Sequence, residues 1–166
     1  MTLTVLQMRR LDPLTESVLV ARYHRGERKG KDLVEITMRE GARSPSLGWS
    51  VEQIDAVSRD PDLRKSYFAG LALLRRSWAT ALYLENGYVP VAQIASDDLN
   101  TAFTLTSSFE GPWTEGRDPR LTVLDTSRAT SSQPGDLIRN DATGEIHLCD
   151  GDGFVSLGVL DAAEAA

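Results

Sequence analysis

The chain has one cysteine, two histidines and no long apolar run among its 166 residues. Cys149 has no partner for an internal disulfide, which is typical of a protein from a reducing compartment. One cysteine and two histidines are too few for a structural zinc site with four such ligands. No segment approaches the roughly 18 apolar residues of a membrane span, and MTLTVLQMRRLDPL lacks the apolar core of a signal peptide. We therefore expect a cytoplasmic protein with no membrane contact, no metal and no cofactor.

The segment SSQPGDLIRNDATGEIHLCDGDGFVSL, residues 131–157, is rich in Asp and Gly and holds the only cysteine. A calcium loop that began at Asp150 would need glycine at its sixth position and glutamate at its twelfth, but Val155 and Asp161 stand there. His147 and Cys149 are two residues apart on a predicted strand, so their side chains point outward in parallel and do not form a catalytic pair. No GxSxG nucleophile motif is present. The pattern therefore predicts backbone turns here, and a protein that is not an enzyme.

The net charge of −6 is distributed unevenly along the chain. Residues 1–78 contain 14 Lys and Arg and 10 Asp and Glu, whereas residues 79–166 contain 4 and 14. An acidic surface repels the phosphates of nucleic acids and attracts basic protein partners. The acidic second half therefore favours a protein partner, with a merely solvated surface as the alternative.

Helix signals are concentrated in the first half. Asp12-Pro13 is typical of a helix start, with an N-cap residue followed by proline at the first helical position. Residues 17–40 fit either two helices or a β-hairpin whose tip is residues 26–30, because their apolar positions match both periods. The sequence leaves these two alternatives open.

Two further signals define the rest of this half. Ser50 and Gln53 form a capping box, which predicts a short helix from residue 51. Asp60-Pro61 predicts the start of a second helix, which we expect to end near Ser77. Leu63 and Phe68 belong to an apolar stripe that predicts the buried face of this second helix.

The second half has β-type patterns. Asn86-Gly87 between two apolar runs predicts a β-hairpin. A helix is expected over residues 97–107, capped by Ser96 or Asp97. Four short segments, LTVLD, DLIR, EIHLC and FVSLGVL, are predicted strands.

These patterns predict an α+β protein in which a mainly helical N-terminal half packs beside a small antiparallel β-sheet carrying one helix. The expected divisions are a basic helical segment over residues 1–78, a β module over 79–161 and a frayed tail over 162–166.

Parts of the second half resemble a known family. The segments SDDLNTAFTLTSSFEGPW (96–113), TSSQPGDLI (130–138) and GDGFVSL (151–157) are similar to the YodL-like family of small proteins from phages, plasmids and conjugative elements. The resemblance covers about residues 80–158, and this chain departs from the family pattern at Gln133-Pro134 and in the acidic run 149–152. It implies a mobile genetic element as the setting and no known activity. The matching residues are Asp98, Leu99, Ala102, Phe103, Leu105, Thr106, Trp113, Thr130, Ser131, Gly135, Asp136, Ile138, Gly153 and Phe154.

The same residues also have a purely structural interpretation. Gly135 and Gly153 would allow close approach of the backbone, Asp136 would accept a hydrogen bond from a turn, and Trp113 and Phe154 would pack on the predicted helix.

We therefore expect a non-catalytic accessory protein that binds, and possibly inhibits, a host or defence protein through an acidic face. The expected contact residues of that face are Glu110, Trp113, Glu115, Asp118, Asp150 and Asp152. The alternative is a nucleic-acid-binding protein that uses a basic cluster in the first half. That cluster consists of Arg22, Arg25, Arg28, Lys29 and Lys31.

Overall fold

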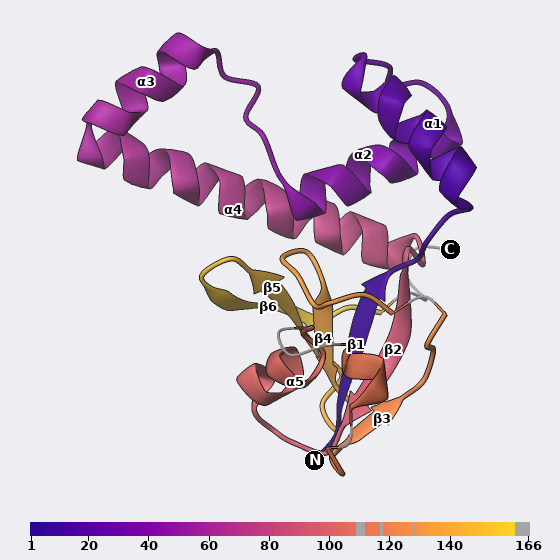
Figure 1. Ribbon diagram of the computed structural model, residues 1–166. Helices are drawn as coiled ribbons and strands as arrows, with labels where there is room; N and C mark the ends of the chain where they lie inside the picture. The colour runs from indigo at the N-terminus through magenta and orange to yellow at the C-terminus, as the bar shows by residue number, and fades with distance from the viewer. Residues whose placement is uncertain (109–111, 117, 128, 162–166) are drawn as a thin grey trace.

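The computed structural model describes residues 1–108, 112–116, 118–127 and 129–161, and it has two layers. Two of four longer helices pack on one face of an antiparallel sheet, the other two pack on those helices, and a short fifth helix lies against the sheet from another side (Figure 1). The expected α+β class is confirmed. The four longer helices are α1 (Pro13–His24), α2 (Lys31–Arg43), α3 (Val51–Arg59) and α4 (Pro61–Leu84), of which α2 and α4 contact the sheet.

Within the described residues the sheet has six strands in the order β3-β2-β1-β4-β5-β6, and every neighbouring pair is antiparallel. The strands are β1 (Leu3–Met8), β2 (Tyr88–Ile94), β3 (Leu121–Val123), β4 (Leu137–Asn140), β5 (Glu145–Asp150) and β6 (Gly153–Val159).

Strand β1 lies in the middle of the sheet although it is the first element of the chain. All its residues are buried, and Leu3 pairs with Ile94 of β2 on one side and Asn140 of β4 on the other. The N-terminal half is mainly helical, as expected, but strand β1 was not expected in it. A short apolar segment that is covered on both faces has no alternation to reveal it as a strand.

The expected boundary at residue 78 is also wrong, because it falls inside α4. This helix does not end near Ser77 but continues to Leu84, and its last turns bury Ala79 and Leu82 against the sheet. Asn86-Gly87 consequently joins a helix to a strand and is not a hairpin tip. Asn86 has a left-handed backbone conformation (φ 56°), which suits the end of a helix as well as a hairpin.

The two alternatives for residues 17–40 are resolved in favour of helices α1 and α2. The Asp12 side chain accepts a hydrogen bond from the Thr15 N–H, and the capping box of Ser50 and Gln53 is present at the start of α3. Gly30 precedes α2 with φ 107°, a conformation that L-residues with side chains rarely adopt.

Each face of the sheet has its own core. The helical side buries Leu6, Leu82, Ile146 and Leu148, and the other side is covered by α5 (Leu99–Leu105) together with the short 3₁₀ helix η1 (Trp113–Glu115). The expected helix over 97–107 is thus present but shorter, and Asp98, rather than Ser96 or Asp97, caps it.

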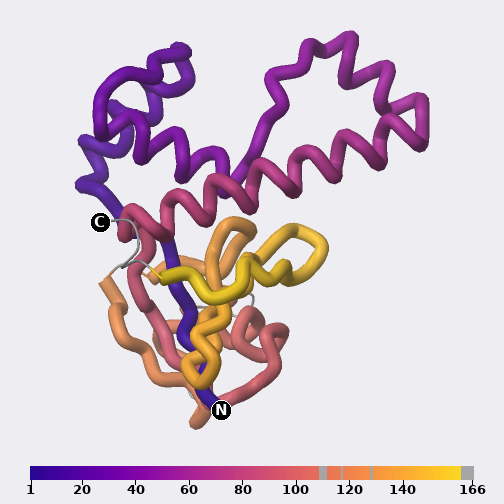
Figure 2. Tube along the Cα trace, turned by 180° about the vertical axis from the view of Figure 1, so that it is seen from behind, coloured from indigo at the N-terminus to yellow at the C-terminus, as the bar shows by residue number. Residues whose placement is uncertain are grey.

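Helix α3 and the first half of α4 extend beyond the sheet, as both Figure 1 and the reverse view in Figure 2 show. We call residues 47–73 the helical arm. Of the helices that the structure describes, none combines the length and the apolar character that crossing a bilayer would require. The expected tail over 162–166 lies outside the described residues.

Candidate functional site

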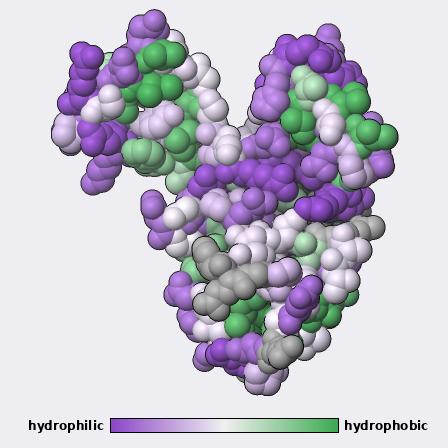
Figure 3. Space-filling view, in the orientation of Figure 1, coloured by the Kyte–Doolittle hydropathy of each residue, from purple (hydrophilic) through white to green (hydrophobic). Residues whose placement is uncertain are grey.

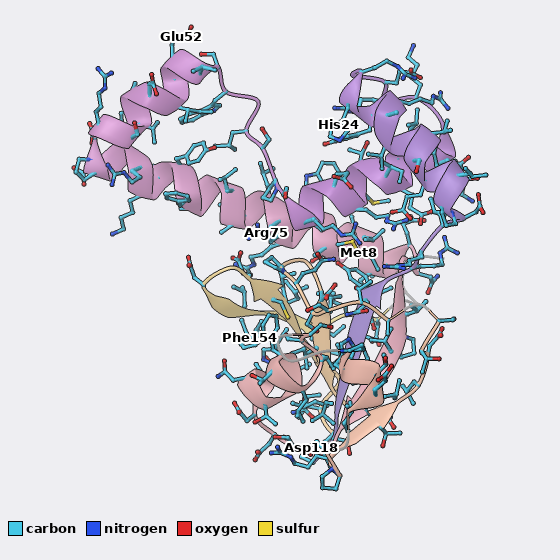
Figure 4. The ribbon with its side chains drawn as sticks, viewed as in Figure 1. Met8, His24, Glu52, Arg75, Asp118 and Phe154 are labelled. Carbon is cyan, nitrogen blue, oxygen red and sulfur yellow. The ribbon has the colours of Figure 1, made fainter. Side chains whose placement is uncertain are left out.

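An open cleft of about 880 Å³ lies between α1 and the loop that precedes β4. One side of α1 forms the first wall, with Glu16 and His24 among its residues (Figure 4, where His24 is labelled). Thr130, Ser131 and Gln133 of the loop form the second wall. Because Arg10 and Arg43 also line this cleft, we call it the arginine cleft.

Arg39 supplies positive charge behind the wall formed by α1. Its guanidinium donates to Glu16 Oε1 at 3.1 Å, and only 1% of the side chain is exposed. Burial lowers the pKa of Arg39, yet an arginine remains charged at neutral pH. One terminal nitrogen, Nη1, is buried and has no hydrogen-bond partner among the described residues. An unpaired donor in such a position costs about 1–3 kcal/mol, which a bound acceptor would recover.

Arg43 lies one turn further along α2 and is the last residue of that helix. Its side chain makes no hydrogen bond or ion pair to any residue that the structure describes, and its Nε is buried. The end of α2 does not need this cation, because Arg75 donates from Nε to the Ala42 carbonyl at 3.1 Å and from Nη2 to the Arg43 carbonyl at 3.2 Å. The Arg43 guanidinium is therefore free to bind an acceptor in the cleft.

The loop wall of the cleft is held rigidly from beneath. Gln7 of β1 accepts a hydrogen bond from the Thr130 N–H at 2.9 Å and donates to the Thr130 carbonyl at 2.8 Å. The indole N–H of Trp113 donates to the same carbonyl at 2.7 Å, and the hydroxyls of Ser132 and Thr106 lie 2.6 Å apart. Strand β1, η1 and α5 thus all position this loop.

Asp136 closes the loop from inside the protein. Its Oδ2 accepts a hydrogen bond from the Gln133 N–H at 3.0 Å, which confirms the interpretation of this carboxyl as an acceptor for a turn. Only 2% of the residue is exposed, and this burial raises its pKa to about 7. The carboxyl faces Gln7 and Gln133 instead of solvent, and the nearby Arg43 guanidinium acts on it electrostatically.

The neighbouring glycine is required by close packing. A Cβ on Gly135 would lie 3.0 Å from the Ala42 carbonyl oxygen, and its φ of 98° is unfavourable for other residues. The expectation of close approach is therefore confirmed for Gly135. It is wrong for Gly153, where a Cβ would meet no atom within 4 Å.

A second, smaller pocket of about 290 Å³ lies beside the only thiol. It is lined by Phe103 of α5, Cys149, and the turn from Asp150 to Phe154. The rings of Phe103 and Phe154 meet edge to face at 6.2 Å, as expected from the sequence, and Trp113 belongs to the same core. Burial raises the pKa of the Cys149 thiol, so it stays protonated and is a poor nucleophile. No group of three potential metal ligands lies together among the described residues.

The residues of the expected acidic face do not share one surface. Trp113 is buried, Asp118 pairs with Arg120 at 2.8 Å, and Asp150 pairs with Arg75 at the junction of the two layers. Figure 4 shows Asp118 at the end of the sheet layer farthest from Arg75. Glu115 and Asp152 are exposed, whereas Glu110 lies outside the described residues. The hydrogen bonds and ion pair with Arg120 lower the pKa of Asp118 to about 2.

The expected basic cluster is partly neutralised. Glu27 pairs with Arg22 at 2.7 Å and with Arg25 at 3.3 Å, and these contacts lower its pKa. The Arg28 guanidinium lies over the Tyr23 ring, 4.0 Å from its centroid. Lys29 is exposed in the loop between α1 and α2, and Lys31 is exposed as the first residue of α2.

The helical arm exposes large apolar side chains, with Val51 at 73% and Phe68 at 60% exposure. Hydrophobic surface is visible on the arm in Figure 3. The sequence pattern predicted that Leu63 and Phe68 face the core, and this prediction is wrong because no sheet lies beneath the arm. The exposed large apolar residues of the arm are Trp49, Val51, Ile54, Leu63, Phe68 and Leu73.

Sequence reasoning missed both the arm surface and the arginine cleft. The basic residues that it selected lie in the α1–α2 loop and in the adjoining helix ends, whereas Arg39 and Arg43 are spaced one helical turn apart further along α2. The spacing of these two arginines was the signal in the sequence that could have pointed to the cleft. Comparison with known proteins finds no matching family model, no similar curated protein and no similar solved structure. The resemblance to the YodL-like family therefore stays an interpretation of the motifs.

Proposed function

We propose that this is a non-catalytic accessory protein of a phage or mobile element that acts in the cytoplasm by binding a host or defence protein. The observation that carries the proposal is the helical arm, which presents large exposed apolar side chains away from the sheet. Single apolar residues on a surface are ordinary, but several on one projecting element are typical of an interaction site.

The proposed occupant of the arm is an amphipathic helix of the partner. Two packed helices, α3 and α4, offer apolar residues along helical faces, and a third helix lying across them would bury both sets. The charges around them are mixed, with Glu52 and Asp55 on α3 and Arg64 and Lys65 on α4. Such a surface suits a protein helix better than a nucleic acid, whose phosphates would meet the acids.

The acidic face keeps a smaller role in this proposal. Glu115 and Asp152 are exposed and free to attract a basic partner over some distance, which raises the rate of association. Asp150 and Asp118 already bind arginines of this chain. The protonated thiol of Cys149 supports a binding role over nucleophilic catalysis.

Nucleic-acid binding through Arg22, Arg25, Arg28, Lys29 and Lys31 stays an untested alternative. A mobility-shift titration at low salt measures it directly, because phosphate contacts weaken steeply as salt is added. Complete absence of a shift at low salt would end this alternative.

The experiment for the proposed function uses the unsubstituted protein, an arm variant and a control variant as baits in a host lysate. Each captured protein is then purified, and its affinity for the three baits is measured. The arm variant carries Val51→Asp and Phe68→Asp, and the control carries Leu14→Asp, an equally exposed apolar residue on α1. We expect the arm variant to bind the purified partner at least about tenfold more weakly, because charges in the contact must be desolvated. Binding that is unchanged in the arm variant, or that is lost equally in the control, would contradict the proposal.

A second variant separates the two contact surfaces. Reversal of Glu115 and Asp152 to lysine is expected to slow association and to change its salt dependence, with little change in dissociation. If this reversal abolishes binding while the arm variant binds normally, the acidic residues and not the arm form the contact.

A further inference from the structure

We propose that the arginine cleft binds an organic phosphate ester, with Arg43 contacting the phosphate and the α1 wall contacting the organic group. The proposal uses a surface other than the arm and goes beyond the proposed function. It starts from charge. Arg10 and Arg43 line the cleft, and Glu16, which already binds Arg39, is the only acid among the described residues that line it. The buried Asp136 also acts electrostatically on Arg43, but its carboxyl accepts its hydrogen bonds from Gln133 and Gln7.

Two donors that would meet the phosphate line the cleft. Arg43 makes no hydrogen bond or ion pair to any described residue, whereas the fully buried Arg39 contributes only positive charge from behind. Ser131 lines the opposite wall, where its Oγ accepts a hydrogen bond from the Ser108 N–H at 3.0 Å. The hydroxyl proton of Ser131 therefore remains available for an anion. Guanidinium groups match phosphate oxygens in pairs, which makes arginine well suited to this contact.

The rigidity of the loop wall supports the assignment. Thr130 is tied to Gln7 and Trp113 by hydrogen bonds of 2.7–2.9 Å, so the residues beside it do not need to be ordered when a ligand enters. A preformed site of this kind loses little conformational entropy on binding.

The size and lining of the cleft indicate an organic ligand and not a bare ion. Its volume of about 880 Å³ lies in the range of sites for small organic molecules. The α1 wall contributes Leu11, Pro13, Val20 and Ala21, which offer no hydrogen bonds from their side chains. A ligand that fits both walls has an anionic end for the arginines and a less polar body for these residues.

The number of acceptor atoms distinguishes phosphate from carboxylate. The Arg43 guanidinium and the Ser131 hydroxyl belong to different parts of the lining. A phosphate ester offers three oxygens outside the ester bond, whereas a carboxylate offers two. The phosphate can therefore pair with two nitrogens of Arg43 and still accept a hydrogen bond from Ser131.

The test is isothermal titration calorimetry on the full chain with phenyl phosphate, inorganic phosphate, benzoate and phenol. We expect phenyl phosphate to bind about tenfold more tightly than inorganic phosphate or benzoate, and phenol not to bind. Arg43→Met is expected to weaken phenyl phosphate about tenfold or more, and Arg43→Lys to weaken it less. The control is Arg76→Met, which removes an exposed cation from α4 outside the cleft. Arg10→Met provides a second cleft variant, and circular dichroism shows whether each variant is folded.

Each outcome decides a part of the proposal. No heat from phenyl phosphate at millimolar concentration, or equal binding by Arg43→Met and Arg76→Met, overturns it. Equal affinity for benzoate overturns the assignment to phosphate, and equal affinity for inorganic phosphate overturns the organic body. The arm variant with Val51→Asp and Phe68→Asp should bind phenyl phosphate normally, so failure of this proposal is distinguishable from failure of the proposed function.

Discussion

Gly41 of α2 lies directly against the indole of Trp78 in α4, so that a Cβ on Gly41 would lie 2.3 Å from Cδ1 of Trp78. No residue larger than glycine fits at this point unless the Trp78 ring or one of the helices moves. The contact therefore sets how closely α2 and α4 cross. Arg43 of the arginine cleft is the last residue of α2, and the arm includes the first half of α4. The crossing of α2 and α4 therefore also fixes the position of the cleft relative to the arm.

The first prediction concerns this crossing. Gly41→Ala should lower the free energy of unfolding by roughly 1–3 kcal/mol, because the added methyl group overlaps the Trp78 ring. The matched control is Gly70→Ala in α4, where the new Cβ would lie 3.5 Å from Leu47, an ordinary contact. Because alanine favours helix over glycine, the control should gain roughly 0.5–1 kcal/mol. Urea denaturation measures both, and equal effects would refute the close crossing.

A second prediction concerns Arg75, which ties the helical layer to the β5–β6 turn. Its guanidinium binds the Ala42 and Arg43 carbonyls and the Asp150 carboxylate, and both members of the ion pair are largely buried. Arg75→Met should destabilise the protein by roughly 2–4 kcal/mol, because two carbonyls and a carboxylate lose their donor. Arg76→Met, one residue away and exposed, should change stability little.

A double-mutant cycle with Asp150→Asn tests the same contact. The two substitutions should not be additive, because either one breaks the ion pair. Additive effects in thermal or urea unfolding would show that Arg75 acts through the α2 carbonyls alone.

The third prediction follows from the buried carboxyl of Asp136. Its pKa is raised to about 7 in the folded protein, whereas the unfolded chain releases the proton near pH 4. Between these values the folded state binds more protons, so this group stabilises the protein at low pH and the contribution is lost as the pH rises toward 7. The slope is at most about 1.4 kcal/mol per pH unit.

Asp136→Asn keeps an oxygen for the Gln133 N–H and removes the titration. Relative to the unsubstituted protein, it should therefore become progressively more stable from about pH 4.5 to pH 7. Urea unfolding at several pH values measures this trend, with Asp152→Asn at an exposed position as the control. A constant difference across that range would contradict the raised pKa.

The fourth prediction is that Cys149 is inert in the native protein. The residue is 3% exposed, and burial raises the pKa of its thiol. A chromogenic disulfide reagent at pH 8 should label it at least about a hundredfold more slowly in buffer than in denaturing urea. Rapid labelling of the native protein would mean that the pocket beside Phe154 opens to solvent and would revive a nucleophilic role for this thiol.

The sequence predicted those parts of the fold that depend on neighbouring residues. Asp12-Pro13, the capping box at Ser50 and Asp60-Pro61 each begin a helix because the cap and the helix are a few residues apart. The strands from Leu137 onward were found for a similar reason, since tight turns separate them.

Features that depend on distant residues were not predictable in this way. Strand β1 shares one core with α4 and the other with α5, and Phe68 is exposed because the arm leaves the sheet. The spacing of apolar residues within a short segment predicts neither fact. Asn86-Gly87 has the same backbone preference in a hairpin and at the end of a helix, so only the extended α4 distinguishes them.

The candidate cleft shows the same limit. Its two walls come from residues 10–24 and 130–133, with Arg43 between them in the chain, and only the folded protein brings them together. Counting charges along the sequence selected the cations in and beside the α1–α2 loop. It could not single out a buried arginine such as Arg39, whose Nη1 has no hydrogen-bond partner among the described residues.

The central place of β1 has a consequence for biosynthesis. A ribosome that adds about 5–20 residues per second completes this strand several seconds or more before the strands that flank it. The pairing of Leu3 with Ile94, and then with Asn140, can form only after those later residues have been synthesised. Helices α1 to α4 can form earlier, because the residues they pack on have already emerged. A nascent chain that stops short of β2 therefore displays LTVLQM without a partner, which makes this segment a natural binding site for chaperones.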